Sequence, residues 1–150
     1  MDAATSANKN VAVGYEASGM AVDIVHNTAV GYFANLYNTT GDNNTIIGST
    51  AAYYQTGSDN VFIGYRTGMG SEGNSTASNS TGIGTEAMLL NRDGTTNTAV
   101  GYRTLYSNLT GDGNSAFGNY AMRNSIGNLS SAFGDRAMYY GTGSANHCAS

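Results

Sequence analysis

Arginine, tyrosine and glutamate recur at one position of this sequence, always two residues after a glycine. The residues at this position are Glu16, Phe33, Thr50, Arg66, Glu86, Arg103, Tyr120 and Arg136. Arginine and tyrosine often dominate recognition surfaces, and a flat tyrosine ring beside polar groups also suits a sugar. The candidate receptor-binding residues are therefore Arg66, Arg103, Tyr120 and Arg136 from this position, together with Tyr102, one of the tyrosines that directly follow a glycine. The alternative is a solvated row in which arginine and glutamate form ion pairs between neighbouring repeats.

The carboxylates, serines and glycines show no pattern that catalysis requires. A glycosidase needs two carboxyl groups about 5–9.5 Å apart. No such pair follows from the spacing of Glu16, Glu72, Glu86 and Asp135. The sequence has no Gly-x-Ser-x-Gly motif with a partner histidine and no phosphate-binding loop. We therefore expect no enzyme, no catalytic residue and no cofactor.

Metal ligands are also sparse. His26 and His147 are isolated, although three copies of one histidine around a threefold axis would supply three ligands. Four aspartates lie in turn-like segments without a calcium-binding repeat, which favours turn capping: Asp42, Asp59, Asp93 and Asp112. We therefore predict no metal site.

The composition favours a weakly charged protein that works outside the cell. The chain has 150 residues, of which 11% are charged, and its formal net charge is −4. This argues against nucleic-acid binding, which requires clustered lysine and arginine. A surface of Asn, Ser, Thr, Gly and Tyr suits an extracellular location, at a cell surface or in a virion tail fibre. The single cysteine, Cys148, excludes an intramolecular disulfide.

Eight similar octets position these residues, and the clearest of them is residues 97–104. They align on Gly14, Gly31, Gly48, Gly64, Gly84, Gly101, Gly118 and Gly134, at spacings of 17, 17, 16, 20, 17, 17 and 16 residues. An apolar residue always precedes the glycine, a small residue stands three after it, and Asn or Ser stands four before it. We assign structural roles in the repeat to Asn27, Gly31, Asn44, Gly48, Asn60, Gly64, Asn97, Gly101, Asn114 and Gly118.

The repeat predicts an all-β solenoid of about eight coils, each of 16–20 residues. A fixed period in this range is typical of stacked repeats, and no helical apolar pattern is sustained. β-branched and aromatic residues before the glycine favour a strand of about five residues, followed by a bend, a short second strand and a turn. Coils stack roughly 4.8 Å apart, so we expect the asparagines to link their side-chain amides from coil to coil.

The octets also set the expected limits of the solenoid. Residues 1–9 are an N-terminal leader or cap, residues 10–145 hold the solenoid, and residues 146–150 begin an incomplete ninth coil. Residues 68–79 contain an insertion, which predicts either a functional loop or a tolerated bulge. An uncapped solenoid end exposes strand edges, so we expect a further domain or another copy to stack end to end on it.

Both faces of the strand carry apolar residues, which favours an assembly of several chains. Val100, before the glycine, and Ala99, two before it, point to opposite faces. One face lines the interior of the coil, and the other requires a partner chain. The sequence leaves open which of the two faces inward.

The octets resemble the head repeats of YadA-like trimeric autotransporter adhesins and, more closely, the NTAVGY-type repeats of bacteriophage tail fibres. The resemblance covers residues 10–137, nearly the whole chain. It implies a homotrimer of left-handed parallel β-rolls around a threefold axis, with a binding task at a cell surface. We therefore expect a non-catalytic attachment segment that binds a host or prey cell-surface glycan or protein. The alternative is a tail-fibre shaft or self-assembling filament subunit that acts only as a spacer.

Overall fold

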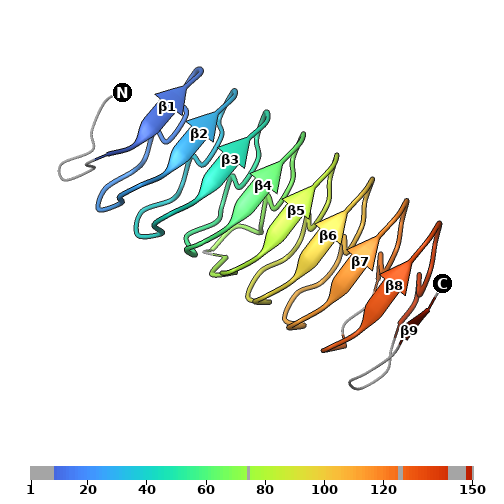
Figure 1. Ribbon diagram of the computed structural model, residues 1–150. Coiled ribbons are helices and arrows are strands. Elements are labelled where there is room, and N and C mark those ends of the chain that lie inside the picture. Colours follow the sequence, from blue (N-terminus) through green and yellow to red (C-terminus); the bar gives the residue numbers. More distant parts are fainter. Residues whose placement is uncertain (1–8, 74, 125–126, 142–147, 150) are drawn as a thin grey trace.

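The chain forms a continuous β-solenoid in which each repeat makes one coil (Figure 1). The computed structural model describes residues 9–73, 75–124, 127–141 and 148–149. Nine parallel strands form a single sheet in sequence order, which confirms the predicted all-β solenoid of about eight coils. The strands are β1 (Val11–Val13), β2 (Thr28–Val30), β3 (Thr45–Ile47), β4 (Val61–Ile63), β5 (Thr81–Ile83), β6 (Thr98–Val100), β7 (Ser115–Phe117), β8 (Ser131–Phe133) and β9 (Cys148–Ala149). These ranges contain no helix long and apolar enough to cross a bilayer.

Equivalent positions of neighbouring octets pair in register. Ala29 lies opposite Ile46, and the register holds across the longest spacing, where Phe62 lies opposite Gly82. The last pair joins β8 to β9, with Ser131 opposite Cys148. The expected leader and part of the expected ninth coil fall on residues 1–8, 142–147 and 150, which lie outside the described residues.

The strands are shorter than expected, and no second strand follows them in the described coils. β1 to β8 have three residues each, and consecutive turns occupy the place of the second strand. The reason is that every second residue at the start of the turn has a positive φ, for example 50° at Arg103 and 52° at Leu105. These values bend the backbone away from the extended conformation of a strand. The turns still join the coils, because Arg103 N–H donates to Thr85 O at 3.0 Å and Leu105 N–H donates to Ala121 O at 2.9 Å.

The residue two before each glycine fills the interior, so the structure answers which strand face points inward. Ala29, Ile46 and Phe62 are buried, whereas the residues directly before the glycine point outward, with Val13 56% exposed and Phe133 49% exposed. The interior is narrow and consists largely of alanine. Phe62 fits because Gly82 lies opposite it, where an added Cβ would come within 3.0 Å of the ring.

The buried asparagines four residues before the glycines join the coils through hydrogen bonds to backbone groups. The prediction that their side-chain amides would bond to one another from coil to coil is therefore wrong. Asn97 Nδ2 donates to Gly111 O at 2.7 Å, and its Oδ1 accepts the N–H of Asn114 at 2.8 Å. Asn27 makes the same two contacts with Gly41 and Asn44. Each of these asparagines thus donates to a carbonyl in the turn of its own coil and accepts an N–H of the next coil, a backbone group that would otherwise be buried unpaired.

A second column of buried amides supports the turns. Asn108 accepts the N–H of Gly111 at 3.0 Å and donates to its carbonyl at 2.7 Å, while it also donates to Asn91 Oδ1 at 3.1 Å. Gln55 Nε2 reaches Asn91 O at 2.7 Å and so spans the insertion. The coil stack therefore continues past the extra residues. An Asn-x-x-Gly pattern in the turns, as in residues 108–111, is the sequence signal for this column.

Candidate ligand-binding surface

All five predicted receptor-binding residues lie on turns that follow strands, and none lies in a strand. Arg66 follows β4, Tyr102 and Arg103 follow β6, Tyr120 follows β7, and Arg136 follows β8. The position two after the glycine has a φ between 48° and 57° in all eight coils. The residue type at this position varies from coil to coil, but the backbone conformation does not. Each turn therefore places this residue at the equivalent point of its coil, so that the eight side chains form one column.

Two of the predicted arginines are held by one glutamate. Arg103 Nε lies 2.6 Å from Glu86 Oε2, and Arg66 Nη1 lies 3.4 Å from Glu86 Oε1. The Glu86 side chain is only 9% exposed, and its hydrogen bond raises the pKa of the Arg103 guanidinium above its ordinary value. The ion pairs expected between coils are thus present at Arg66 and Arg103. Glu86 fixes both side chains and neutralises much of their charge.

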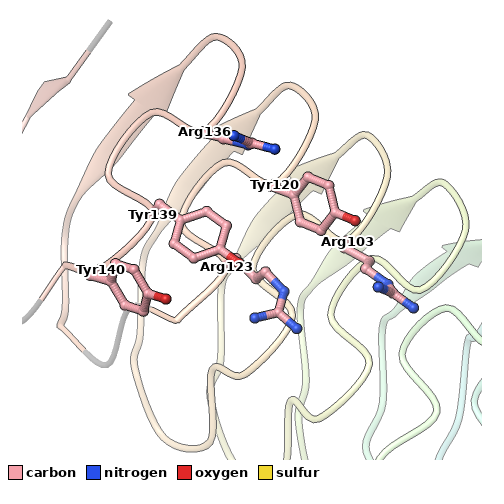
Figure 2. Close-up of a pocket in the computed structure, with 6 residues that line it drawn as sticks. All are labelled: Arg103, Tyr120, Arg123, Arg136, Tyr139 and Tyr140. Atoms are coloured by element: carbon pink, nitrogen blue, oxygen red, sulfur yellow. The ribbon is translucent and has the colours of Figure 1, made fainter.

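Arg103, Tyr120 and Arg136 come together at a cleft of about 590 Å³, which Arg123, Tyr139 and Tyr140 complete (Figure 2). The six side chains come from the turns after β6, β7 and β8, so three consecutive coils build the cleft. Tyr102 lies beside it, with its ring 5.2 Å from that of Tyr120. A hydrogen bond with the hydroxyl of Tyr120 raises the pKa of Tyr102 above its ordinary value, so the Tyr102 phenol is neutral at physiological pH.

Arg123, Tyr139 and Tyr140 line the cleft but are not among the predicted binding residues, and Arg123 is the cation among them. Its guanidinium lies 4.9 Å from the ring centre of Tyr106, 5.6 Å from that of Tyr139 and 5.9 Å from that of Tyr120. Its position, five residues after Gly118, corresponds to Tyr106 and Tyr139 in the coils on either side. The sequence signal was an arginine at a position that tyrosine occupies in both adjacent coils, which predicts a cation stacked between aromatic rings.

A second hollow of about 390 Å³ lies over the earlier coils. It is lined by Tyr32, Phe33, Thr50, Tyr53, Tyr54, Tyr65, Arg66 and Met69. Aromatic rings contact one another throughout this region, with Tyr37 stacked on Tyr54 at 5.3 Å. Arg66 is the cation that lines it, and that side chain is paired with Glu86. The two hollows thus differ in charge: one arginine lines the earlier, aromatic hollow, whereas three arginines line the later one.

Among the residues that the structure describes, no three His, Cys, Asp or Glu side chains form a group that would hold a metal ion. His26 belongs to the described part, whereas His147 lies outside it. Cys148 is exposed as a free thiol.

No model of a known protein family matches the sequence, and no curated protein or solved structure matches the chain. Its function therefore has to be inferred from its own geometry.

Proposed function

We propose that this chain is an attachment segment of a homotrimeric extracellular fibre, displayed at a cell surface or in a virion tail. It binds a glycan or protein on a host or prey cell and catalyses no reaction. The observation that carries this proposal is the convergence of arginine and tyrosine side chains from three coils on one cleft. The cleft residues lie on turns, outside the buried alanine-rich interior. The turn backbone joins the coils, but the side chains that it presents differ from coil to coil, which favours a role in recognition.

The outer face of the sheet supports the trimeric state. Apolar residues directly before the glycines line this face from coil to coil, among them Ile47, Ile83 and Phe117. These three side chains are 39%, 38% and 36% exposed, and Phe117 stacks on Phe133 with ring centres 5.2 Å apart. At roughly 4.8 Å per coil, such a column forms a continuous apolar stripe along the solenoid. The cleft residues lie on turns and not in the strands, and we expect burial of this stripe between three chains to leave them accessible.

Attachment is tested with the purified protein on intact cells and on a glycan array. We expect the wild type to bind, the double variant Tyr102→Ala/Arg103→Ala to lose most binding, and Arg92→Ala to bind like the wild type. Arg92 is the matched control, since it is paired with Asp93 and does not line the cleft. Unchanged binding by the double variant would exclude this surface. Degradation of a capsule layer in a halo assay would contradict the absence of catalysis.

A second candidate is a spacer that holds other parts of a fibre apart. The observation in its favour is that Glu86 already engages Arg66 and Arg103, which is what a purely structural ladder requires. This candidate predicts a trimer that binds no cell and no glycan. The cell-binding measurement therefore separates the two candidates.

A further inference from the structure

The cleft between the turns after β6, β7 and β8 carries a concentration of positive charge that the rest of the chain lacks. The whole chain has six Lys and Arg residues and a formal net charge of −4. Three of the six cations, Arg103, Arg123 and Arg136, line this one cleft. The carboxylate that pairs with a cleft arginine is Glu86, which also pairs with Arg66. Asp135, the acidic neighbour of Arg136 in the sequence, accepts a hydrogen bond from Asn119 at 2.7 Å.

Arg123 is held in place but incompletely hydrogen bonded. Its Nε is buried and has no hydrogen-bond partner among the described residues, and its Nη1 reaches Asn124 Oδ1 only at 3.4 Å. The rings of Tyr106, Tyr120 and Tyr139 surround the guanidinium and fix its plane. The buried Nε is out of a ligand's reach, but Arg123 is only half-buried and lines the cleft, so a ligand meets the accessible part of this side chain. Because the surrounding rings already restrain the side chain, little ordering cost remains when the ligand binds.

The tyrosines supply the second requirement for a ligand. Tyr140 is 75% exposed, and its ring lies 4.6 Å from that of Tyr139 at an angle of 70°. Together the two rings form a corner with one face open to solvent. An apolar ring face beside hydrogen-bonding hydroxyls suits the C–H face and hydroxyl groups of a pyranose ring. The volume of about 590 Å³ is in the range of small-molecule sites.

We infer that this cleft binds an acidic saccharide, a pyranose that carries a carboxylate or a sulfate group. The anionic group pairs with Arg123 and Arg136, and the sugar ring packs against Tyr139 and Tyr140. Guanidinium groups bind such planar or tetrahedral anions through two parallel hydrogen bonds, which a neutral hydroxyl cannot match. The inference rests on the attachment function proposed above and names the class of ligand. The earlier hollow is lined by one arginine, which is paired with Glu86, and we expect it to show no preference for acidic sugars.

The test compares three probes that share a lactose core: lactose, 3′-sialyllactose and 3′-sulfolactose. Binding to the full chain is measured by titration calorimetry and by saturation-transfer NMR at low and high salt. We expect one or both acidic probes to bind, lactose to bind at least about tenfold more weakly, and salt to weaken the acidic complex. Stronger binding of the sialylated probe identifies a carboxylate ligand, and stronger binding of the sulfated probe identifies a sulfate. Equal binding of lactose, or no binding of either acidic probe, overturns the inference.

Three variants locate the binding site. Arg123→Gln/Arg136→Gln removes two charges and is expected to lower affinity for the acidic probe by about tenfold or more, as expected for lost hydrogen bonds to a charged group. Tyr140→Ala, at a highly exposed position that cannot disturb the interior, is expected to lower it several-fold. Arg92→Ala removes an arginine outside the cleft and is expected to leave affinity unchanged. Unchanged affinity in Tyr140→Ala and in the double variant overturns the site.

The outcomes keep this inference separate from the proposed function. If the chain binds cells but neither acidic probe, the acidic-saccharide inference is wrong and the attachment function stands. If the chain binds neither cells nor any probe, both are wrong. If acidic probes bind but the chain still binds cells treated with sialidase and sulfatase, a different cell-surface ligand uses another part of the surface. In that case the cleft is retained as the acidic-saccharide site only if the cleft variants lose probe binding.

Discussion

At the scale of single residues, Glu86 determines how charge is distributed along the surface. Its side chain is nearly buried and lies within ion-pair distance of Arg66 and Arg103, which are 35% and 32% exposed. A partly buried carboxylate with two cationic partners stabilises the fold more than an exposed pair does. Glu86 pairs with Arg103 in the cleft, whereas no carboxylate of the described residues pairs with the other two cleft arginines, Arg123 and Arg136.

Replacement of Glu86 tests this arrangement. Glu86→Gln leaves two neighbouring guanidinium groups without a counter-charge, so we expect a loss of roughly 1–2 kcal/mol in the free energy of unfolding. The control is Glu72→Gln, at an exposed position without an ion pair in the described structure, and it is expected to change stability little. Urea denaturation followed by circular dichroism measures both. Equal stability of the two variants would contradict the structural role of Glu86.

Part of the candidate site could be predicted from sequence, because the repeat aligns residues of successive coils. Alignment on the glycines placed Arg103, Tyr120 and Arg136 in one column, and all three line the cleft. Arg123 was missed because it belongs to a different column, which reaches the same cleft through the curvature of the turn. The inward tilt of Glu86 was also not predictable, since charge and spacing alone do not distinguish a solvated glutamate from a buried one.

At the scale of the coil, the buried asparagines provide the clearest test of how repeats are joined. Asn97→Ala removes one of the two donors to Gly111 O, which keeps its bond from Asn108, and it removes the acceptor of the buried Asn114 N–H, which is left unpaired. We expect a loss of about 1–3 kcal/mol in the free energy of unfolding. Asn97→Ser should lose clearly less, because Ser80 already accepts the N–H of the next coil at 3.2 Å in the same column. If chemical denaturation shows Asn97→Ser to be less stable than Asn97→Ala, this role of Asn97 is contradicted.

The repeated glycine is tested by a matched pair of substitutions. Gly101 and Gly134 have φ values of 134° and 123°, so alanine at either position is strained by about 1–3 kcal/mol. At Gly101 an added Cβ would also lie 2.3 Å from Gly118 O, whereas at Gly134 it meets no described atom within 4 Å. We therefore expect Gly101→Ala to be more destabilising than Gly134→Ala by a further 1–3 kcal/mol or so. Thermal denaturation of the two variants measures the difference, and equal melting temperatures would contradict close backbone stacking.

The coil also shows where sequence reasoning succeeded and where it failed. The period and the apolar alternation predicted a parallel solenoid and its register, because both follow from which residues must align. The predicted strand length of about five residues and the predicted second strand were both wrong. Non-glycine residues such as Thr50 and Ala52 adopt positive φ, a conformation that their side chains disfavour. The stack imposes this conformation through bonds to both neighbouring coils, and no local propensity reports it.

At the scale of the whole molecule, the outward apolar column links the fold to the proposed assembly. Replacement of Ile47 and Phe117 by aspartate places two charges on the outer sheet face without touching the interior. We expect Ile47→Asp/Phe117→Asp to remain folded by circular dichroism but to form monomers, since charge at a buried interface is unfavourable. Leu129→Asp, at a turn residue 58% exposed, is the control and should keep the wild-type assembly. Sedimentation velocity distinguishes these states, and an unchanged assembly in the double variant would show that this face is not the interface.

The most direct test of the proposed fibre segment is the mass of the full chain in solution, measured by light scattering after size-exclusion chromatography over a range of concentrations. A solenoid that buries its outer column among three copies predicts a single species with three times the mass of the chain. A single stable species with the mass of one chain, at all concentrations, would contradict the trimer and leave the outer apolar column without its proposed partner.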